Sequence, residues 1–157
     1  MTIALRQAVA SDAAAIRDLT RAAYAKWVPV IRREPKPMTV DYDAAVRRDR
    51  FDLLFIADAL AALIQTVQEA DHLLIENVAV RPGLQGRGLG RRLLAQAEDL
   101  ARRLGFQEAR LFTNGAFAEN IALYRHLGYR VTLEEPFLDG TVVHMTKTLD
   151  QSSPLSA

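Results

Sequence analysis

The apolar positions along this chain follow two periods, one typical of helices and one typical of strands. Helical spacing predicts helices over about Asp12–Lys26, over Tyr42–Arg50, from Leu89 to the residue before Gly105, and over Ala118–Leu127. Short apolar runs predict strands over Ile3–Gln7, Leu53–Asp58, Ala61–Gln68, His72–Val80, Ala109–Thr113, Tyr129–Glu134 and Val142–Thr148. Trp27–Met38 contains three prolines and therefore cannot form one continuous helix. The pattern predicts an α/β domain with about six or seven strands.

A glycine-rich turn joins the strand that ends at Val80 to the longest predicted helix. It reads Arg81-Pro82-Gly83-Leu84-Gln85-Gly86-Arg87-Gly88-Leu89-Gly90. A helix that starts in such a turn directs unpaired N–H groups and the positive end of its dipole at an anion. Glycines at 86, 88 and 90 would let the backbone approach that anion closely. The turn therefore predicts a site for a phosphate or pyrophosphate on a larger cofactor.

Two familiar phosphate loops do not fit this turn. A dinucleotide fold needs G-x-G-x-x-G and an acidic residue after the next strand, but here the spacing is G-x-G-x-G and the strand ends in Thr113-Asn114. A nucleoside-triphosphate loop needs Lys-Ser or Lys-Thr after the last glycine, where this chain has Arg91-Arg92. A plain helix-start turn is a further alternative, although three alternating glycines cost much backbone entropy for that role.

Composition narrows the class of protein. The 157 residues suit one domain, half of them are apolar, and the net charge of +1 favours neither nucleic acid nor an anionic membrane as partner. The chain has no cysteine, which excludes disulfides and thiolate chemistry, and its three histidines lack metal-site spacing, so no metal is expected. We expect a cytoplasmic enzyme or binding protein, with a polar, disordered tail from residue 150 or 151 to Ala157.

Several segments resemble the GNAT superfamily of acyl-CoA-dependent N-acyltransferases. Gln85–Gly90 resembles the family's pyrophosphate signature, Q/R-x-x-G-x-G/A. Glu76–Pro82 is similar to the family's fourth strand, Asn120–Tyr129 to its last helix and the strand that follows, and Val142–Leu149 to its final strand. The resemblance implies one GNAT domain over residues 1–149. Its sheet would be mixed and mostly antiparallel, with splayed fourth and fifth strands and about four flanking helices.

The resemblance also implies acetyl-CoA as the cofactor. Its pantetheine arm would bond to the main chain of the strand residues Val78, Ala79 and Val80. Its pyrophosphate would lie among the loop residues Gln85, Gly86, Arg87, Gly88, Leu89, Gly90 and Arg91. The side chains of Arg87 and Arg91 would either approach the 3′-phosphate or stay in solvent. Asn120 would contact the cofactor near the sulfur or cap a helix, and Asn114 would reach the pantetheine or only close a turn with Gly115.

For the chemistry, the resemblance places Tyr124 as the general acid that protonates the leaving thiolate. The alternative is a packed tyrosine whose hydroxyl finds a partner in the core. Glu76 would be the base, directly or through a water, or would form a salt bridge with an arginine. Asn77 would face away from Glu76 unless the strand is bulged, as it usually is in this family, in which case Asn77 would face the acceptor site. Trp27, Arg32 and Tyr42 would line the acceptor site, or belong to an ordinary packed loop.

The sequence therefore predicts an N-acetyltransferase that moves acetyl directly from acetyl-CoA to a primary amine. Two alternatives stay open: a non-catalytic acyl-CoA-binding regulatory domain, and an enzyme that acts on protein or peptide amines. Exposed strand edges in this fold often pair, which leaves a homodimer open. The sequence does not identify the amine.

Overall fold

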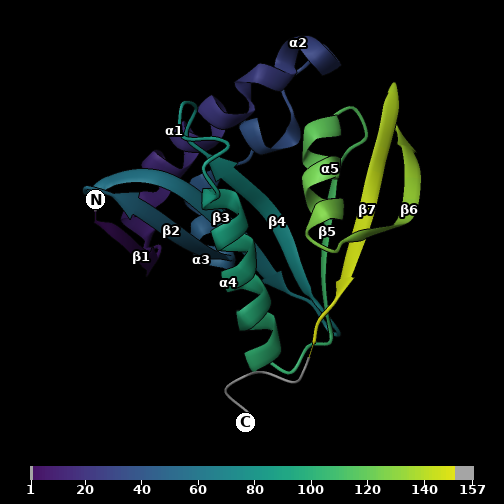
Figure 1. Ribbon diagram of the computed structural model, residues 1–157. Coiled ribbons are helices and arrows are strands. Elements are labelled where there is room, and N and C mark those ends of the chain that lie inside the picture. Colours follow the sequence, from purple (N-terminus) through teal and green to yellow (C-terminus); the bar gives the residue numbers. More distant parts are fainter. Residues whose placement is uncertain (1, 151–157) are drawn as a thin grey trace. The chain divides into compact units, whose positions relative to one another are not determined.

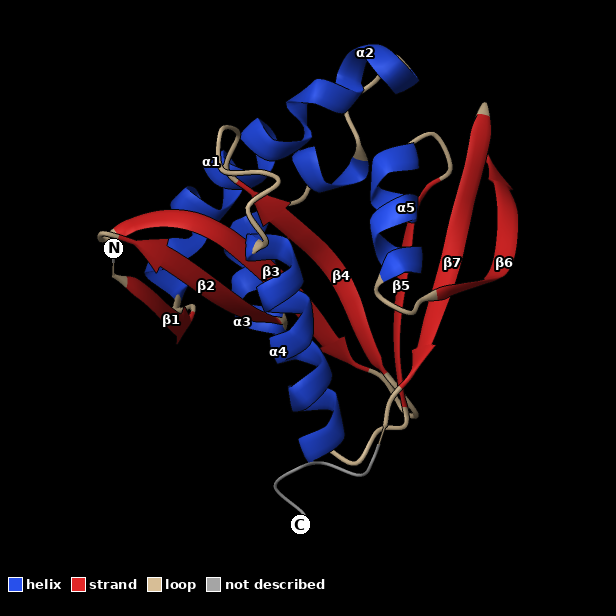
Figure 2. Ribbon diagram, in the orientation of Figure 1, coloured by secondary structure: helices blue, strands red, loops and turns tan. Residues whose placement is uncertain are grey.

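The computed structural model describes residues 2–150 and contains seven strands, which are joined by helices or by short turns (Figures 1 and 2). The strands are β1 Ile3–Gln7, β2 Arg50–Ile56, β3 Ala59–Gln68, β4 Leu73–Val80, β5 Glu108–Asn114, β6 Arg130–Phe137 and β7 Gly140–Thr148. The α-helices are α1 Ala13–Tyr24, α2 Val28–Ile31, α3 Tyr42–Arg48, α4 Leu89–Arg103 and α5 Ala118–His126. The 3-10 turns are η1 Ala10–Asp12, η2 Ala25–Trp27 and η3 Lys36–Met38. The predicted tail at 151–157 lies outside the described residues.

The strands form one mixed sheet in the order β1-β2-β3-β4-β5-β7-β6. Strand β4 pairs with β5 in parallel, whereas the β1–β2, β2–β3, β5–β7 and β6–β7 pairs are antiparallel. The parallel ladder joins only Leu73–Ile75 to Ala109–Leu111. The predicted fold class, an α/β domain with a mixed and mostly antiparallel sheet, is confirmed. The four predicted helices are present, together with α2, a single turn in the proline-rich segment.

The chain packs as two compact units. The first unit is Met1–Val67 with Glu76–Gln96, and the second is Gln68–Ile75 with Ala97 onward.

In the first unit, helices α1 and α3 bury their apolar sides against strands β2, β3 and β4. The core contains Ile16, Leu19, Ala23, Tyr42, Ala45, Phe51, Leu53, Leu63 and Ala79. Side chains alternate between the faces of a strand, so Val78 and Val80 lie on the face opposite Ala79. There they meet the start of α4: a Cβ added to Gly90 would lie 3.7 Å from Val80 Cγ2. Strand β4 is therefore covered on both faces, and the glycine loop emerges directly from its end.

Strand β2 begins earlier than the apolar pattern predicts. It starts at Arg50, which pairs with Thr66 across the ladder, rather than at Leu53. The buried Asp52 accepts hydrogen bonds of 3.0 and 3.1 Å from Arg50, so a charged pair occupies strand positions that the apolar pattern could not identify. The strand then turns through Ala57 and Asp58, whose φ angles of 49° and 69° replace the missing glycine.

In the second unit, β5, β7 and β6 carry a buried polar cluster against the second half of α4. Glu98 is 6% exposed, and its carboxylate accepts hydrogen bonds from the Tyr129 hydroxyl at 2.9 Å and from Lys147 Nζ at 2.9 Å. Burial and the neighbouring Glu98 carboxylate both raise the pKa of Tyr129. The cluster joins the helix to two strands, because its three members come from α4, from the residue before β6 and from β7.

We expect Lys147→Met to lower the free energy of unfolding by roughly 1–3 kcal/mol, because it leaves the buried Glu98 charge with one partner fewer. The double variant Glu98→Gln, Lys147→Met should recover most of that loss, since no buried charge remains. Urea denaturation of both proteins measures the difference. Equal stability of the single variant and the wild type would contradict this account of the cluster.

Candidate active site

The glycine loop between β4 and α4 is held in shape by local hydrogen bonds and by left-handed backbone. Leu84 N donates to Arg81 O at 3.0 Å, which closes a turn over Pro82 and Gly83. Gly86 and Gly88 both have a φ of 82°, a conformation that a residue with a side chain rarely adopts. No atom lies within 4 Å of where their Cβ atoms would stand. The structure therefore requires glycine at these two positions for backbone conformation.

The loop leaves a run of backbone donors without acceptors. The first helical hydrogen bond after the loop joins Arg92 N to Gly88 O at 3.0 Å. Within the described chain, the N–H groups from Gln85 to Arg91 donate to no backbone carbonyl. Free N–H groups at the start of a fifteen-residue helix, together with the positive end of its dipole, form a site suited to an anion. The arrangement matches what the glycine spacing predicts.

Gly90 differs from the other glycines of the loop. It lies inside α4 without a positive φ, and its side faces Val78 and Val80 at ordinary contact distances. The glycine spacing predicts that Gly90, like Gly86 and Gly88, lets an anion approach the backbone. In the structure it allows the helix to lie close to β4.

Some side chains of the loop bond to the protein, and others are exposed to solvent. Gln85 Nε2 donates to Val80 O at 3.1 Å, and Gln85 Oε1 accepts from Lys26 Nζ at 3.1 Å. Arg87 and Arg91 are exposed and form no ion pair with any described residue. Gln85 therefore braces the loop against β4, while both arginines are free to contact a ligand.

The end of β4 presents backbone groups along one edge. Arg81 N donates to Ala61 O of β3 at 2.8 Å. Since successive residues of a strand direct their N–H and C=O groups to alternate sides, Val78 and Val80 direct theirs away from β3. This is the orientation that pairing with a pantetheine arm would require.

Polar side chains cluster on β4 next to this edge. Burial alternates along the strand, so Asn77 shares the buried side with Ala79, and Glu76 is partly exposed. Tyr24 of α1, which the sequence analysis did not single out, donates from its hydroxyl to Asn77 Oδ1 at 2.8 Å and lies 3.4 Å from Val78 O. Burial and the charge of Glu76 raise the pKa of Tyr42 to about 12. Glu76 thus lies within electrostatic range of Tyr42.

Tyr124 lies in α5 of the second unit, with its ring against that of Tyr129. The ring centroids are 6.1 Å apart and the planes meet at 66°. Burial raises the pKa of Tyr124 to about 12. Its hydroxyl forms no hydrogen bond with any described residue, unlike the Tyr129 hydroxyl, which is bonded to Glu98. Tyr124 is therefore a protonated phenol whose donor is available to a ligand.

Comparison with known proteins places this geometry in a family. The sequence profile of the Acetyltransferase (GNAT) family matches residues 14–129, which include the loop, β4 and Tyr124. The chain belongs to the GNAT family of acetyltransferases. This confirms the resemblance in the sequence. Because the family uses acetyl-CoA, the predicted cofactor is confirmed as well.

Individual GNAT relatives are distant. Mouse N-alpha-acetyltransferase 80 is 38% identical over 71 residues, which are 45% of this chain and 21% of that protein. The crystal structure of the PaiA N-acetyltransferase from Thermoplasma acidophilum, in complex with coenzyme A, has a TM-score of 0.80 at 19% identity and covers 94% of this chain and 99% of that one. The ribosomal-protein-S18-alanine N-acetyltransferase of Escherichia coli has a TM-score of 0.77 at 22% identity, covering 98% and 97%. These two structures share the GNAT fold with this chain.

Two asparagines predicted to bind the GNAT cofactor lie in different surroundings. Asn114 ends β5, and its Oδ1 accepts from Ala116 N at 2.9 Å, so its side chain closes the turn as the alternative interpretation stated. Asn120 lies in the first turn of α5, whose N-cap residue is Phe117. The Asn120 side chain is partly buried and forms no hydrogen bond with the described residues. Of the two, Asn120 has the side chain available to a ligand.

The residues predicted for the acceptor site differ in their exposure to solvent. Trp27 is 7% exposed and Tyr42 3%, and the Tyr42 hydroxyl donates to Pro37 O at 2.6 Å. Arg32 is exposed at the end of α2 with a φ of 61°. The packed-loop alternative therefore describes Trp27 and Tyr42, and only Arg32 presents its side chain to solvent.

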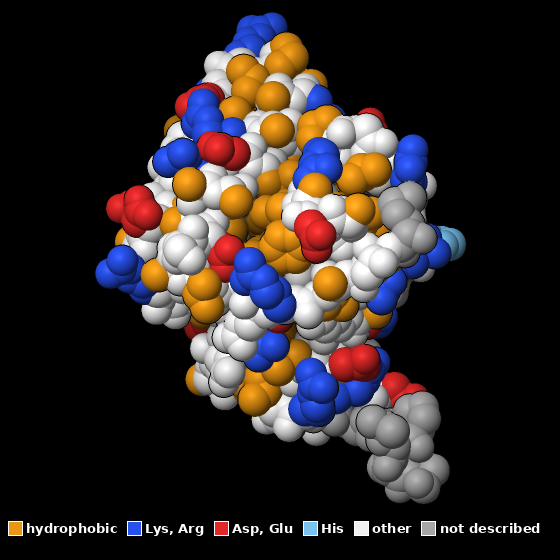
Figure 3. Space-filling model, turned by 90° about the vertical axis from the view of Figure 1, so that its left-hand side faces the viewer, with side chains coloured by type: hydrophobic (Ala, Val, Ile, Leu, Met, Phe, Trp, Pro, Cys, Tyr) orange, Lys and Arg blue, Asp and Glu red, His pale blue; other side chains and the backbone are white. Residues whose placement is uncertain are grey.

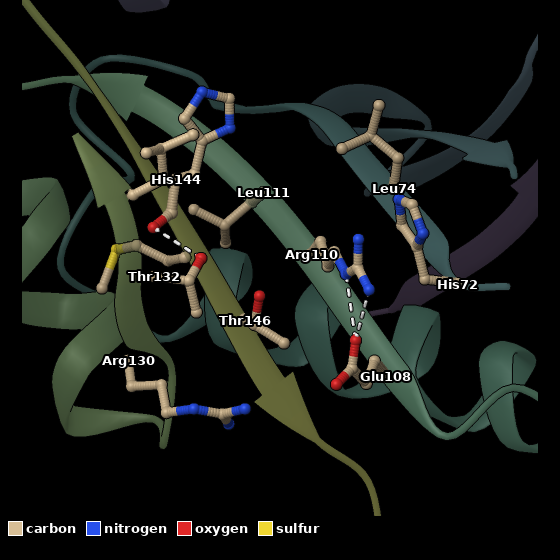
Figure 4. Close-up of a pocket in the computed structure, with 11 residues that line it drawn as sticks. His72, Leu74, Glu108, Arg110, Leu111, Arg130, Thr132, His144 and Thr146 are labelled. Carbon is tan, nitrogen blue, oxygen red and sulfur yellow. Dashed lines mark hydrogen bonds and ion pairs between the residues drawn. The ribbon is translucent and has the colours of Figure 1, made fainter. Parts of the chain in front are cut away.

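A hollow of about 420 Å³ lies in the second unit, lined by residues of β4, β5, β6 and β7 (Figure 4). Its charged groups are paired within the protein: both Arg110 Nε and Nη2 bond to Glu108 Oε1, and His144 bonds to Glu135 at 2.6 Å. His72 bonds to Asp71 at 2.7 Å. The hollow therefore offers a ligand few free polar groups.

Charges of both signs are interspersed with hydrophobic side chains on the face of the molecule that Figure 3 shows. Among the described residues, no group of three or more His, Asp or Glu side chains could hold a metal ion. No helix in the described part of the chain is long and apolar enough to cross a membrane.

Proposed function

We propose that this GNAT protein transfers the acetyl group of acetyl-CoA directly to a primary amine. The observation that carries the proposal is the run of unpaired N–H groups from Gln85 to Arg91 at the start of α4. It supports a pyrophosphate site of the kind that a CoA-dependent enzyme needs. Arg87 and Arg91 are proposed to contact phosphate, since neither side chain has an acidic partner among the described residues.

The proposed mechanism needs one base and one acid. Glu76 accepts the proton of the amine, directly or through a water, so that the nitrogen can attack the thioester carbon. The new C–N bond forms as the C–S bond breaks, and Tyr124 donates its phenolic proton to the departing sulfur. A pKa of about 12 keeps Tyr124 protonated at neutral pH. A chain without cysteine offers no thiol for an acetyl-enzyme thioester, which supports direct transfer.

Release of the CoA thiol, followed with a thiol-reactive dye, tests the proposal. The protein contributes no background because the chain has no cysteine. We expect thiol release that depends on both acetyl-CoA and an amine, with mass spectrometry showing one added acetyl group on the acceptor. Thiol release without acetylated acceptor would indicate hydrolysis and contradict the proposal.

The acceptor panel should contain small amines, polyamines, amino acids and peptides with free N-termini. Peptides belong in it because the names of two similar proteins, N-alpha-acetyltransferase 80 and ribosomal-protein-S18-alanine N-acetyltransferase, refer to α-amino groups. A preference for peptides would favour the alternative of a protein or peptide acetyltransferase. The exposed Arg32 would favour an acceptor with a carboxylate.

The rival function is a non-catalytic acyl-CoA-binding domain. Tight binding of CoA with no turnover on any acceptor would support that rival. The free hydroxyl of Tyr124 favours catalysis, since a domain that only binds needs no such group. A cytoplasmic location, a small-molecule or peptide acceptor rather than nucleic acid or membrane, and a possible homodimer stay predictions.

A further inference from the structure

The side-chain amide of Asn77 is an unsatisfied donor in the interior of the first unit. Asn77 is 4% exposed, and its Nδ2 has no hydrogen-bond partner among the described residues. A buried donor without a partner has lost its hydrogen bond to water and gained none in the protein, which destabilises the folded state. Such a cost in a native protein calls for an explanation, and a ligand oxygen is one.

The hydrogen bond from Tyr24 determines which atom of the Asn77 side-chain amide has no partner. Its hydroxyl donates to Asn77 Oδ1 at 2.8 Å, across 53 residues of sequence. The oxygen end of the carboxamide is therefore held toward α1, and the nitrogen end carries both free N–H groups. Tyr24 acts through Asn77 and is a positioning residue.

The Tyr24 hydroxyl also shows where the Asn77 amide lies along β4. It lies 3.4 Å from Val78 O, which points away from β3 to the edge proposed to pair with the pantetheine arm. The glycine loop follows Val80, so Asn77 lies past Val78 on the side away from the pyrophosphate site. An arm that runs from the loop along Val80 and Val78 brings its thioester end to Asn77 and Glu76.

We infer that Asn77 Nδ2 donates a hydrogen bond to the carbonyl oxygen of the acetyl thioester and stabilises the negative charge that develops there. This rests on the proposed function, and it replaces the acceptor contact that the sequence suggested for Asn77. When the amine nitrogen bonds to the carbonyl carbon, the π electrons move to this oxygen. They return as the C–S bond breaks, and the sulfur takes that bonding pair with a proton from Tyr124. A fixed amide donor aimed at such an oxygen lowers the barrier.

The variant Asn77→Ala tests the inference. We expect kcat to fall about 100-fold, by the same factor for every acceptor, with CoA affinity unchanged. In ¹³C NMR without acceptor, the carbonyl of [1-¹³C]acetyl-CoA should move downfield on binding to the wild type and not on binding to Asn77→Ala. Tyr24→Phe should reduce both effects less, because the donor remains but is no longer oriented.

Thr20→Val is the matched control. Thr20 lies on α1 and is fully buried, so its hydroxyl is a second buried polar group in the same unit. Removing its hydroxyl should leave kcat and the carbonyl shift as in the wild type. This separates the loss of a buried polar atom from the loss of the donor at Asn77.

The outcomes are distinct. A loss of rate confined to some acceptors, with the carbonyl shift intact, would place Asn77 against the acceptor and overturn the inference. An unchanged kcat would overturn it as well. A wild-type protein that binds no acetyl-CoA would instead refute the proposed function itself.

Discussion

Tyr124→Phe is expected to lower kcat by about 10²–10⁴-fold while leaving CoA affinity unchanged, the range typical of a lost general acid. Phenylalanine keeps the ring and its edge contact with Tyr129 and removes only the hydroxyl, which bonds to no described residue. The folded state should therefore lose little stability. Steady-state kinetics and calorimetric titration with CoA measure the two effects separately.

Tyr129→Phe is the matched control for Tyr124, because it also removes one tyrosine hydroxyl beside the same ring contact. Its hydroxyl bonds to Glu98, so we expect lower stability and a kcat near that of the wild type. An unchanged rate in Tyr124→Phe, or equal losses of rate in both variants, would remove the acid role from Tyr124.

The pH profile gives a second check on Tyr124. Burial raises its pKa from 10.0 to about 12, so the phenol keeps its proton as the pH rises toward that value. Ionisation of Tyr124 should therefore not limit kcat below about pH 11. The same shift acts on stability in a defined direction: the unfolded chain ionises first, so stability falls from about pH 10 to pH 12.

Gly88→Val is expected to abolish measurable CoA binding while the protein stays folded. Gly88 has a φ of 82°, and a β-branched residue there is strained. The loop would relax that strain by changing its backbone angles, which would turn its free N–H groups away from a common anion. Calorimetric titration with CoA measures binding, and circular dichroism with thermal unfolding confirms the fold.

Gly90→Ala is the control for the loop. Gly90 lacks a positive φ, and an added Cβ would make ordinary contacts of 3.7 and 3.8 Å with Val80 and Val78. We therefore expect CoA binding within a few-fold of the wild type. Retained binding in Gly88→Val would remove the loop from the cofactor site. Loss of binding in both variants would indicate a requirement for space rather than for backbone conformation.

The sequence predicts the elements well where the signal is local. The apolar stripe of α4, the C-terminal Gly105 with its φ of 86° and the strand Ile3–Gln7 all lie where the pattern places them. The strand prediction is least accurate at the start of β2. Arg50 and Asp52 occupy strand positions there, and their charged side chains pair with each other. The prediction counts apolar positions, so it does not recognise strand residues whose charged side chains pair with each other.

The candidate site divides in the same way. The glycine spacing determines the left-handed backbone of the loop before α4, because φ preference and helix initiation depend on neighbouring residues alone. The role of Tyr24 has no local signal, since its partner Asn77 is 53 residues away. The sequence alone does not show which of Asn114 and Asn120 is the better candidate for a cofactor contact. The structure distinguishes them, because the Asn114 side chain closes a turn through its bond to Ala116 N.

The sequence by itself determined the family, the glycine-rich loop and the order of the elements, because each depends on short-range spacing. Only the tertiary structure decided which polar groups are satisfied. In the folded chain the Tyr129 hydroxyl bonds to Glu98, the Tyr124 hydroxyl bonds to no described residue, and the Tyr24 hydroxyl bonds to the Asn77 amide. The physical reason is that burial and hydrogen bonding depend on groups that folding brings together from distant parts of the chain.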